Sequence, residues 1–547
     1  MNVKPSLLAV LGAIVTIGAL SMGATAFAQS ADQQRVVVSY KAGGKGPVMA
    51  ALRNSKGQVH HELDRLNAVA VTLPAAALNG IGRNPHVEYV EADELRYPLA
   101  QTTPYGIPMV QADLVSDAMA SNQKVCIIDS GYDSMHEDLP SSMSMVNGTN
   151  DSGTGNWFMD EHGHGTHVAG TIAALNNNGK GVVGVAPSGN LQLHIIKVFN
   201  ADGWAYSSTL ANALGACEAA DATVVSMSLG GSRANRTERR AFDNAYGRGV
   251  LSVAAAGNDG NTRHSYPASY DSVISVAAID STKTIADFSQ QTDQVELAAP
   301  GVAVLSSVPM GTGSNVSLVV AGTGYEAIGM EGSATGTGTG PLVDCGLGTS
   351  ACSGSEGAVC LIQRGDIAFS DKVLACQAGG GVAAIIYNNV PGSLSGTLGG
   401  EATSIPSVGI SDTDGATLGG QPGATTSVTV ETGNYAFFDG TSMATPHVSG
   451  VAALVWSHYS TCTNAEIRAA LGSTAEDLGD AGRDNAYGHG LVQAQAAFNY
   501  LADGCGGGGG GGGGGACELL PSGASCTSDS ECCSNNCKGK PGRKTCK

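Results

Sequence analysis

The chain has 547 residues, which is enough for several domains, and only 5% of them are aromatic. Its formal net charge of −19 argues against nucleic acid or an anionic membrane as the main partner. No run beyond the N-terminal leader is long and apolar enough to span a bilayer. These properties favour a multidomain protein whose partners are not polyanions.

The N-terminus has the three parts of a secretory signal. Lys4 precedes the apolar run from Leu7 to Leu20, and Ala26-Phe27-Ala28 is a small-x-small cleavage site. The apolar run is too short and too rich in glycine for a membrane anchor. We therefore predict a signal peptide over residues 1–28 and a secreted, extracellular protein. Export makes the fourteen cysteines candidates for disulfides.

Residues 29–99 alternate between strand-like and helix-like patterns. The periodicity predicts strands at 35–40, 68–73 and 86–91, and helices at 48–66 and 75–82. Such a segment is a small α/β unit of its own. An independent α/β module is one interpretation of it, and a regulatory role is the other.

The next apolar run, Lys124 to Ile128, leads into Asp129-Ser130-Gly131. A buried strand of a parallel sheet has this pattern, and its carboxylate would lie at the carboxyl edge, where α/β folds place their chemistry. A lone aspartate at this point also commonly caps a turn.

Three histidines follow at the start of a predicted helix, in His162-Gly163-His164-Gly165-Thr166-His167. Their spacing raises the possibility of a zinc site. No matching acidic or cysteine ligand set accompanies them, which disfavours zinc.

Near the C-terminal end, Gly440-Thr441-Ser442-Met443-Ala444 leads directly into the apolar run from Val451 to Trp456. This places the Ser442 hydroxyl at a helix N-terminus, where unpaired N–H groups and the helix dipole favour negative charge. For a single serine, a helix cap is the commoner role.

Together these three segments resemble the motifs of the subtilisin family of serine peptidases, in the chain order of that family. The resemblance implies a catalytic triad of Asp129, His164 and Ser442, with His167 as a structural residue. It also implies an α/β fold in which a parallel β-sheet is flanked by helices. The expected activity is that of a serine endopeptidase, which hydrolyses peptide bonds through an acyl-enzyme intermediate.

Two strand-like segments, Val224 to Gly231 and Val250 to Asn258, carry further positions of the family. By resemblance, Asn258 and the Ser442 N–H form the oxyanion hole, although an Asn at a strand end also serves as a plain cap. The resemblance assigns substrate binding to Ser228, Leu229, Gly230, Ala255 and Gly257. Gly230 and Gly257 would leave room for a bulky apolar side chain before the scissile bond (P1), so we expect broad specificity.

The resemblance makes residues 29–99 an inhibitory propeptide, so that the chain is its own intramolecular partner besides its protein substrates. We predict self-cleavage after Leu99, which starts the catalytic domain (residues 100–505) at Ala100. We expect the mature enzyme to be a monomer.

Calcium is the cofactor that the resemblance implies. The positions that match the strong site of the family are Gln101, Asp138, Leu175, Asn177 and Val182. Ligation by oxygen atoms alone suits Ca²⁺. The loop is one residue longer than the commonest family form, which leaves a carbonyl from Gly179 or Lys180 open.

Residues 310–433 exceed what a minimal catalytic domain needs, and the segments 357–365 and 379–389 resemble a protease-associated domain. Binding of protein substrates, control of access to the cleft and a purely stabilising spacer remain open as its roles. We expect its four cysteines to pair among themselves, namely Cys345, Cys352, Cys360 and Cys376.

A glycine tether over residues 506–516, with an r.m.s. span of about 17 Å, precedes a basic segment at 517–547 with six cysteines. Their spacing resembles an inhibitor cystine knot, and a metal cluster is the alternative. The resemblance implies the pairs Cys517–Cys533, Cys526–Cys537 and Cys532–Cys546. Elsewhere, Cys462 and Cys505 would clip two helices together. Cys126 and Cys217 either form a bridge or stay as buried thiols.

Two other functions compete with the peptidase. One is a catalytically silent relative that only binds, which the loss of a triad or oxyanion residue would favour. No such residue is lost in this sequence. The other places the purpose of the protein in the cysteine-rich tail, as an inhibitor or toxin-like module carried by the protease.

Overall fold

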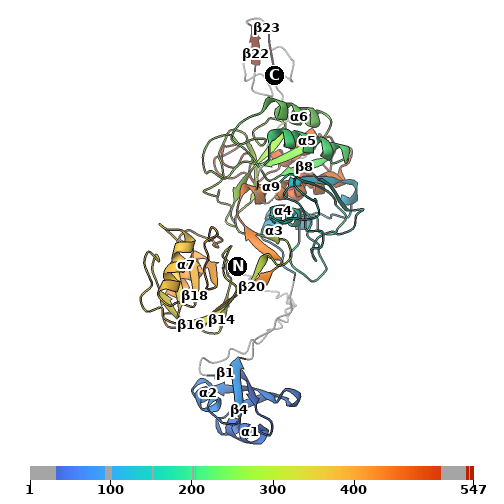
Figure 1. Cartoon of the computed structure of the whole chain (residues 1–547). Coiled ribbons are helices and arrows are strands. Elements are labelled where there is room, and N and C mark those ends of the chain that lie inside the picture. The colour runs from blue at the N-terminus through green and yellow to red at the C-terminus, as the bar shows by residue number, and fades with distance from the viewer. Residues whose placement is uncertain are drawn as a thin grey trace, which may run out of the picture. The chain divides into compact units, whose positions relative to one another are not determined.

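The computed structural model describes residues 33–92, 101–150, 153–199, 203, 205–506, 537–540 and 543–546 (Figure 1). The chain divides into two compact units, Met1–Pro98 with Val320–Gly324, and Leu99–Val319 with Tyr325–Lys547. The predicted signal peptide, the predicted cleavage point after Leu99, and the glycine tether beyond Gly506 lie outside the described residues.

The N-terminal unit is a four-stranded antiparallel sheet with two helices. Its elements are β1 (Gln33–Tyr40), α1 (Lys45–Asn54), β2 (Gln58–Leu63), a 3-10 helix η1 (Asp64–Leu66), β3 (Ala68–Pro74), α2 (Ala75–Gly82) and β4 (Val87–Ala92). The strand order is β2-β3-β1-β4. Alternate apolar residues of β1 and β3, such as Val38 and Val71, are fully buried with Leu52 of α1.

The predicted helix over 48–66 is wrong in its second half. Helix α1 ends at Asn54, and residues 58–63 form strand β2, which pairs with β3. Lys56 has a positive φ of 57°, and a Cβ at Gly57 would lie 2.9 Å from the Leu52 carbonyl oxygen. The backbone therefore turns sharply here, which a continuous helix does not allow.

The core of the second unit is a seven-stranded sheet. Its strands are β5 (Lys124–Asp129), β6 (Val146–Asn150), β7 (Gln192–Lys197), β8 (Val224–Met227), β9 (Leu251–Ala255), β10 (Val273–Ile279) and β11 (Val295–Pro300). Every pair is parallel, in the order β11-β10-β9-β8-β5-β7-β6. The central strands are buried along their whole length, as expected for a sheet covered on both faces.

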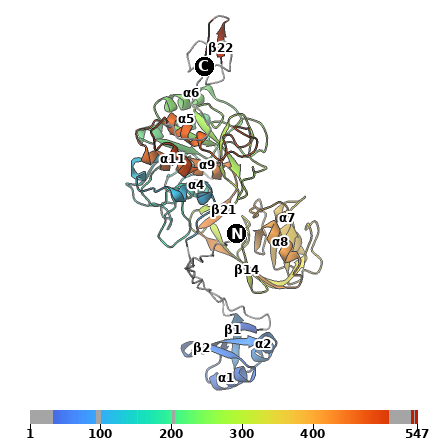
Figure 2. The same cartoon turned by 180° about the vertical axis from the view of Figure 1, so that it is seen from behind.

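Helices cover both faces of this sheet (Figures 1 and 2). On one face, α4 (His164–Ala173) packs on the long helix α9 (Thr441–His458), and both share one apolar core with the sheet. On the other face, α5 (Ser207–Ala219) and α6 (Arg236–Gly247) form a second core. The remaining helices are α3 (Gly106–Met109), η2 (Ala112–Leu114), η3 (Ala120–Asn122), α10 (Asn464–Ser473) and α11 (Ala494–Tyr500).

Two disulfides brace this domain. Cys126 of β5 is bonded to Cys217 of α5, which settles the open alternative in favour of a bridge. Cys462 is bonded to Cys505, as predicted, and ties the turn before α10 to the segment after α11.

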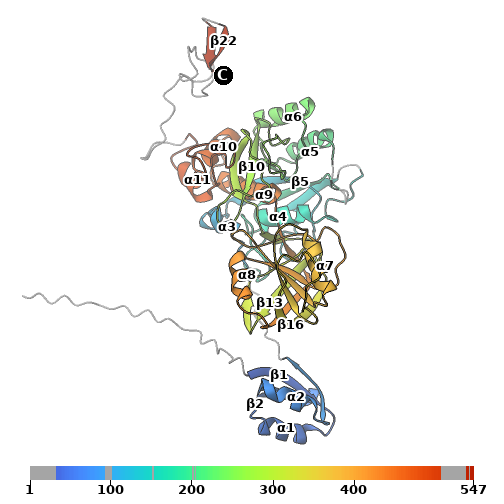
Figure 3. The same cartoon turned by 90° about the vertical axis from the view of Figure 1, so that its left-hand side faces the viewer.

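The insertion leaves and re-enters the catalytic domain through one antiparallel ribbon of β12 (Val304–Ser307) and β21 (Tyr435–Phe438). Its own sheet has the order β14-β13-β20-β16-β17-β18-β19-β15 (Figure 3). The bounds are β13 (Gly313–Val320), β14 (Thr323–Tyr325), β15 (Ile328–Gly329), β16 (Gly336–Asp344), β17 (Val359–Gln363), α7 (Phe369–Ala378), β18 (Ala383–Tyr387), β19 (Ser407–Ile410), α8 (Asp412–Gly419) and β20 (Thr425–Gly433).

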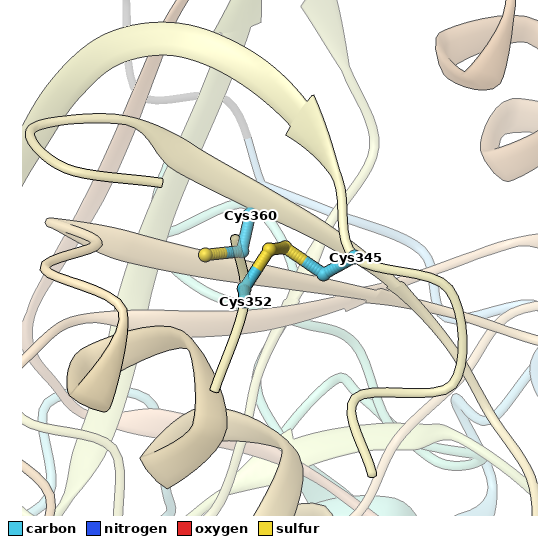
Figure 4. A group of neighbouring side chains, drawn as sticks. All are labelled: Cys345, Cys352 and Cys360. Carbon is cyan, nitrogen blue, oxygen red and sulfur yellow. A yellow bond between two sulfur atoms is a disulfide. The ribbon is translucent and has the colours of Figure 1, made fainter. Parts of the chain in front are cut away.

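The four cysteines of the insertion pair among themselves, as predicted. Cys345 is bonded to Cys352, and Cys360 to Cys376. Figure 4 shows the first bridge with Cys360 beside it. Because all three cysteines of this group are in disulfides, their proximity does not indicate a metal site.

Of the predicted cystine knot, the structure describes only a hairpin of β22 (Cys537–Lys540) and β23 (Arg543–Cys546), in which Cys537 and Cys546 are cross-strand neighbours. Cys517, Cys526, Cys532 and Cys533 lie outside the described residues, so the three predicted pairs stay predictions. Within the described residues, no helix is long and apolar enough to cross a membrane.

Candidate active site

The predicted Asp–His pair is formed at the carboxyl edge of the sheet. Asp129 is the last residue of β5, and His164 is the first residue of α4. The Nδ1–H of His164 donates to Asp129 Oδ1 over 2.8 Å. The Asp129 side chain is fully buried, whereas 21% of the His164 side chain is exposed. The carboxylate therefore holds Nδ1 of the imidazole and leaves Nε2 free of this bond.

The environment of His164 favours its protonated form. Burial alone lowers the pKa of His164, but the charge and the hydrogen bond of Asp129, together with the charge of Asp160, outweigh it and raise the pKa above its usual value. An imidazole beside a buried carboxylate is a stronger base than a free one.

Behind this pair lies a polar network that the sequence analysis missed. Ser130 Oγ donates to Asp160 Oδ1 over 2.8 Å and accepts from the N–H of Gly165 over 2.9 Å. The other oxygen of Asp160 accepts from the Thr166 N–H over 2.9 Å and from its hydroxyl over 2.6 Å. Asp160, which is 8% exposed, therefore caps the first turn of α4 and fixes the position of His164. An aspartate four residues before the histidine was the only signal in the sequence.

Ser442 lies in the first turn of α9, where the α-helix dipole favours negative charge. Its hydroxyl donates to the Ser228 carbonyl oxygen over 3.2 Å rather than to His164, and the Ser228 hydroxyl donates to the Ser442 carbonyl oxygen over 2.6 Å. Ser228 therefore ties the end of β8 to the start of α9. Hydrogen bonds between a nucleophile and its base are often loose without substrate and tighten when it binds.

Asn258 directs its amide oxygen toward the start of α9. Its Oδ1 accepts from the Thr441 N–H over 2.9 Å and from the Thr441 hydroxyl over 2.7 Å. This occupies the oxygen of the amide and leaves its NH₂ group as a donor. Thr441, which the sequence analysis did not single out, thus sets the orientation of Asn258.

Two clefts meet at the Leu229–Ser232 segment, which lines both. The smaller cleft, of about 280 Å³, lies beside Ser442 and Asn258 and is also lined by Ala255 and Gly257. The larger cleft, of about 520 Å³, contains Asp129 and His164. The predicted substrate-binding residues therefore surround Ser442.

Two glycines of the smaller cleft, Gly230 and Gly257, lie close to neighbouring protein side chains. A Cβ at Gly257, whose φ is +112°, would lie 1.7 Å from Gln290 Oε1. A Cβ at Gly230 would lie 2.3 Å from Ser265 Oγ. The backbone conformation at Gly257 therefore favours glycine, whereas a side chain at Gly230 would have to displace the Ser265 hydroxyl.

The predicted calcium ligands also come together. The Gln101 amide nitrogen donates to the carbonyl oxygens of Leu175 and Val182 and to Asn178 Oδ1. Asp138, which is fully buried, accepts from the Asn178 side chain over 2.6 Å and from the Val182 N–H over 2.8 Å. Burial raises the pKa of Asp138 more than these hydrogen bonds lower it. The cluster is thus rich in oxygen atoms.

The asparagine of this cluster differs from the expected one. Asn177 takes part through its backbone N–H, which donates to Gln101 Oε1 over 2.9 Å, whereas Asn178 contributes its side-chain oxygen. Asn177 has a positive φ of 58°, in the left-handed region, which asparagine adopts more readily than most residues.

The three histidines do not converge on one point. The rings of His162 and His164 are 6.0 Å apart, but Nε2 of His167 donates to the Val304 carbonyl oxygen over 2.9 Å. His167 is fully buried and stacks on Phe438 with ring centroids 4.4 Å apart. It is a core residue that joins α4 to the β12–β21 ribbon.

Three family models match the chain. The subtilase family matches residues 120–339 and 409–490, the PA domain matches residues 338–418, and the fervidolysin N-terminal prodomain matches residues 28–93. These matches follow the α/β unit, the seven-stranded sheet and the insertion that the structure shows.

Individual relatives agree with the family models. Subtilisin E of Bacillus subtilis (strain 168) is 29% identical over 90% of this chain and 97% of its own length. Subtilisin DY of Bacillus licheniformis is 43% identical over 39% of this chain and 77% of its own length. A crystal structure of the psychrophilic subtilisin-like protease Apa1 from Pseudoalteromonas sp. AS-11 is 44% identical, with a TM-score of 0.66, over 75% of this chain and all of that one. The chain therefore belongs to the subtilase family and is a subtilisin-type serine endopeptidase with a prodomain and an inserted protease-associated domain.

Proposed function

We propose that Ser442 is the nucleophile of this peptidase, His164 its general base and Asp129 the residue that orients the base. The observation that carries this proposal is the hydrogen bond of 2.8 Å between His164, whose side chain is 21% exposed, and the fully buried Asp129. Ser442 lies in the first turn of α9. A serine hydroxyl is a poor nucleophile until a neighbouring base accepts its proton.

The reaction would run in two halves. Ser442 Oγ attacks the scissile carbonyl carbon while His164 Nε2 takes the hydroxyl proton, and His164 then gives this proton to the leaving amine. Water hydrolyses the acyl-enzyme with the same base. Asp129 keeps the Nδ1–H tautomer in place and stabilises the imidazolium.

The negative oxygen of the tetrahedral intermediate would be stabilised by the Asn258 amide and the backbone N–H of Ser442. The support is the orientation of Asn258, since Thr441 occupies its oxygen and leaves the NH₂ group free to donate.

We further propose that the smaller cleft takes the P1 side chain, with broad specificity and a preference for bulky apolar residues. It adjoins Ser442 and Asn258, and Ala255 and the Leu229–Ser232 backbone form its walls. An apolar wall discriminates only weakly between side chains of similar size.

In the same proposal the enzyme is secreted as a self-processing zymogen, cleaved after Leu99, and acts as a monomer. The match of residues 28–93 to a prodomain supports the inhibitory role of this segment. The four disulfides of the described chain are typical of an oxidising compartment.

We also propose Ca²⁺ as a structural ion of the cluster around Asp138. Gln101, Asp138, Asn178 and the carbonyl groups of Leu175 and Val182 would hold it, and Asn177 would support Gln101. The fit rests on a fully buried carboxyl group with a raised pKa among oxygen atoms, since a bound cation compensates such a group. The ion would supply positive charge that joins the N-terminal segment to the loop.

The test compares intact masses, before and after reduction, of the secreted wild type and of Ser442→Ala. We expect the wild type to begin at Ala100 and to hydrolyse casein, and Ser442→Ala to keep residues 29–99 and to be inactive. Identical loss of the propeptide from both proteins, without added protease, would contradict self-processing. Casein hydrolysis by Ser442→Ala would contradict the assignment of the nucleophile.

A further inference from the structure

The larger cleft contains a buried acid that the peptidase mechanism does not use. Besides Asp129 and His164, it is lined by the apolar side chains of Leu210 and Leu229 and by Tyr266. Glu238 of α6 also lines it, although this residue is only 3% exposed. A carboxyl group with so little exposure in an apolar surrounding calls for a hydrogen-bonding partner.

Within the protein, Glu238 is only half satisfied. Its Oε2 accepts from the Tyr270 hydroxyl over 2.7 Å, and its backbone N–H is capped by Asn235. Among the described residues, Oε1 has no hydrogen-bonding partner. Burial raises the pKa of Glu238 more than the Tyr270 hydrogen bond lowers it, so an incoming donor or cation would stabilise the carboxylate.

The geometry of an extended substrate decides which of its residues reaches this cleft. Successive side chains of a strand point to opposite faces, at a rise of about 3.3 Å per residue. If P1 enters the smaller cleft beside Ser442, then P2 and P4 lie on the other side, above the larger cleft. P2 is one residue from P1 and thus nearer to His164, while P4 lies about 10 Å from P1, so P4 is the residue that reaches farther along the larger cleft.

Apart from Asp129, His162, His164 and Glu238, the larger cleft is lined by one more charged side chain, that of Arg233. Arg233 is exposed and forms no ion pair with Glu238 among the described residues. Its guanidinium group would repel a cationic side chain, but water screens an exposed charge more strongly than a buried one. The buried carboxyl group therefore has the larger influence on a bound side chain.

We propose that Glu238 is a specificity-determining residue of this enzyme, which selects a basic side chain, lysine or arginine, at the P4 position of the substrate. The inference rests on the proposed placement of P1 in the smaller cleft. The roles proposed for Asp129, His164 and Ser442 stay the same.

The test uses N-acetylated tetrapeptide p-nitroanilides with Ala-Ala-Phe at P3 to P1 and lysine, glutamine, leucine or glutamate at P4. We expect the wild type to cleave the lysine peptide with a kcat/KM about tenfold above that of the leucine peptide, and glutamate to be the poorest. A charge-assisted hydrogen bond in a buried site supports a ratio of this size.

The variants separate charge from packing. Glu238→Gln keeps the size of the side chain and the hydrogen bond to Tyr270, and should bring the lysine-to-leucine ratio close to one. Glu238→Leu should invert the ratio, and Arg233→Ala should increase it. Tyr270→Phe removes the hydrogen bond to Glu238 but keeps the carboxyl group, so this variant should still prefer lysine. Ratios on one enzyme preparation cancel differences in folded fraction.

A wild-type ratio of one or less, or an unchanged ratio in Glu238→Gln, would overturn the proposal. A parallel series with phenylalanine, alanine, lysine or glutamate at P1 separates this failure from that of the proposed function. If the P1 series shows the apolar preference and the P4 series does not respond to Glu238, the inference alone is wrong. If the P1 preference is absent, the proposed placement of P1 is wrong and the inference falls with it.

Discussion

The Ser130 hydroxyl donates a hydrogen bond of 2.8 Å to Asp160, directly behind the Asp129–His164 pair. Asp160 also caps the first turn of α4 and contributes to the raised pKa of His164. We predict that Asp160→Asn lowers kcat about tenfold or more with little change in KM, because misplacement of a catalytic group by a fraction of an ångström is costly. It should also move the acid limb of the profile of kcat/KM against pH to lower pH, because a negative charge that favours the imidazolium is lost.

The neighbouring carboxylate provides a matched control. Glu161 is half exposed and pairs with the buried Lys197, and its charge is not among those that raise the pKa of His164. Glu161→Gln should leave the acid limb in place. If Asp160→Asn reduces kcat without moving the acid limb, Asp160 acts through the position of the helix alone and not through its charge on His164.

A second prediction concerns the orientation of Asn258. Asn258→Ala should lower kcat by about 10²–10³-fold at nearly constant KM, a magnitude known for this change in a subtilisin. Thr441→Val removes the hydroxyl donor to Asn258 Oδ1 but keeps the backbone N–H donor, so its loss of kcat should be smaller. Steady-state kinetics on one p-nitroanilide peptide measures both. Additive losses in the double variant would show that Thr441 does not act through Asn258.

The elements that carry the triad could be predicted from the sequence, because buried parallel strands are apolar along their whole length. The run that ends at Asp129 is β5, and the run before Asn258 is β9, which ends at Ala255. Ser442 lies in the first turn of a helix, as expected. The roles expected for these residues came from the family resemblance, through the chain order of the motifs. The disulfide of Cys126 and Cys217 could not be decided, because a buried strand and a buried helix suit thiols as well.

Residues whose role depends on distant partners could not be found in the same way. Asp160, Thr441 and Glu238 have no local pattern that distinguishes them from ordinary caps or solvated groups. Their partners are Ser130, Asn258 and Tyr270, which lie 30 or more residues away in the chain. The contact of the Asn178 side chain with Gln101 could not be predicted for a related reason, since the backbone path of a longer loop decides which side chain turns inward.

A third prediction tests the calcium site through stability. Removal of Ca²⁺ by a chelator should lower the thermal-unfolding midpoint of the mature enzyme, inactivated beforehand with a serine-directed sulfonyl fluoride to prevent autolysis. At 100 times its Kd, a bound ion stabilises the folded state by about 2.7 kcal/mol. Asp138→Asn should abolish the response to Ca²⁺, whereas Asp113→Asn, which changes an exposed carboxylate outside the cluster, should keep it. An equal response in both variants would place the ion elsewhere.

The last prediction concerns acid stability and two buried histidines. Burial, with the charge of His164 as a further cause, lowers the pKa of His167 to about 3, and burial lowers that of His447 to about 4. His167 Nδ1 and His447 Nε2 are buried without hydrogen-bonding partners among the described residues, which favours neutral rings. The unfolded chain binds protons at both near pH 6.5. Their contribution to stability is therefore complete above pH 6.5 and is lost as the pH falls toward 4.

Each histidine should contribute roughly 1.4 kcal/mol per pH unit to this loss, so the two together contribute roughly 2.8 kcal/mol per unit near pH 5, between the folded and the unfolded pKa values. In His447→Gln, whose amide can still donate to the Met443 carbonyl oxygen, the difference in slope from the wild type should be close to one proton. Carboxyl groups that titrate in this range affect both proteins alike, so the comparison isolates His447. The measurement is the free energy of unfolding of the inactivated enzyme against pH, and equal slopes in the wild type and His447→Gln would show that His447 is already protonated in the folded state.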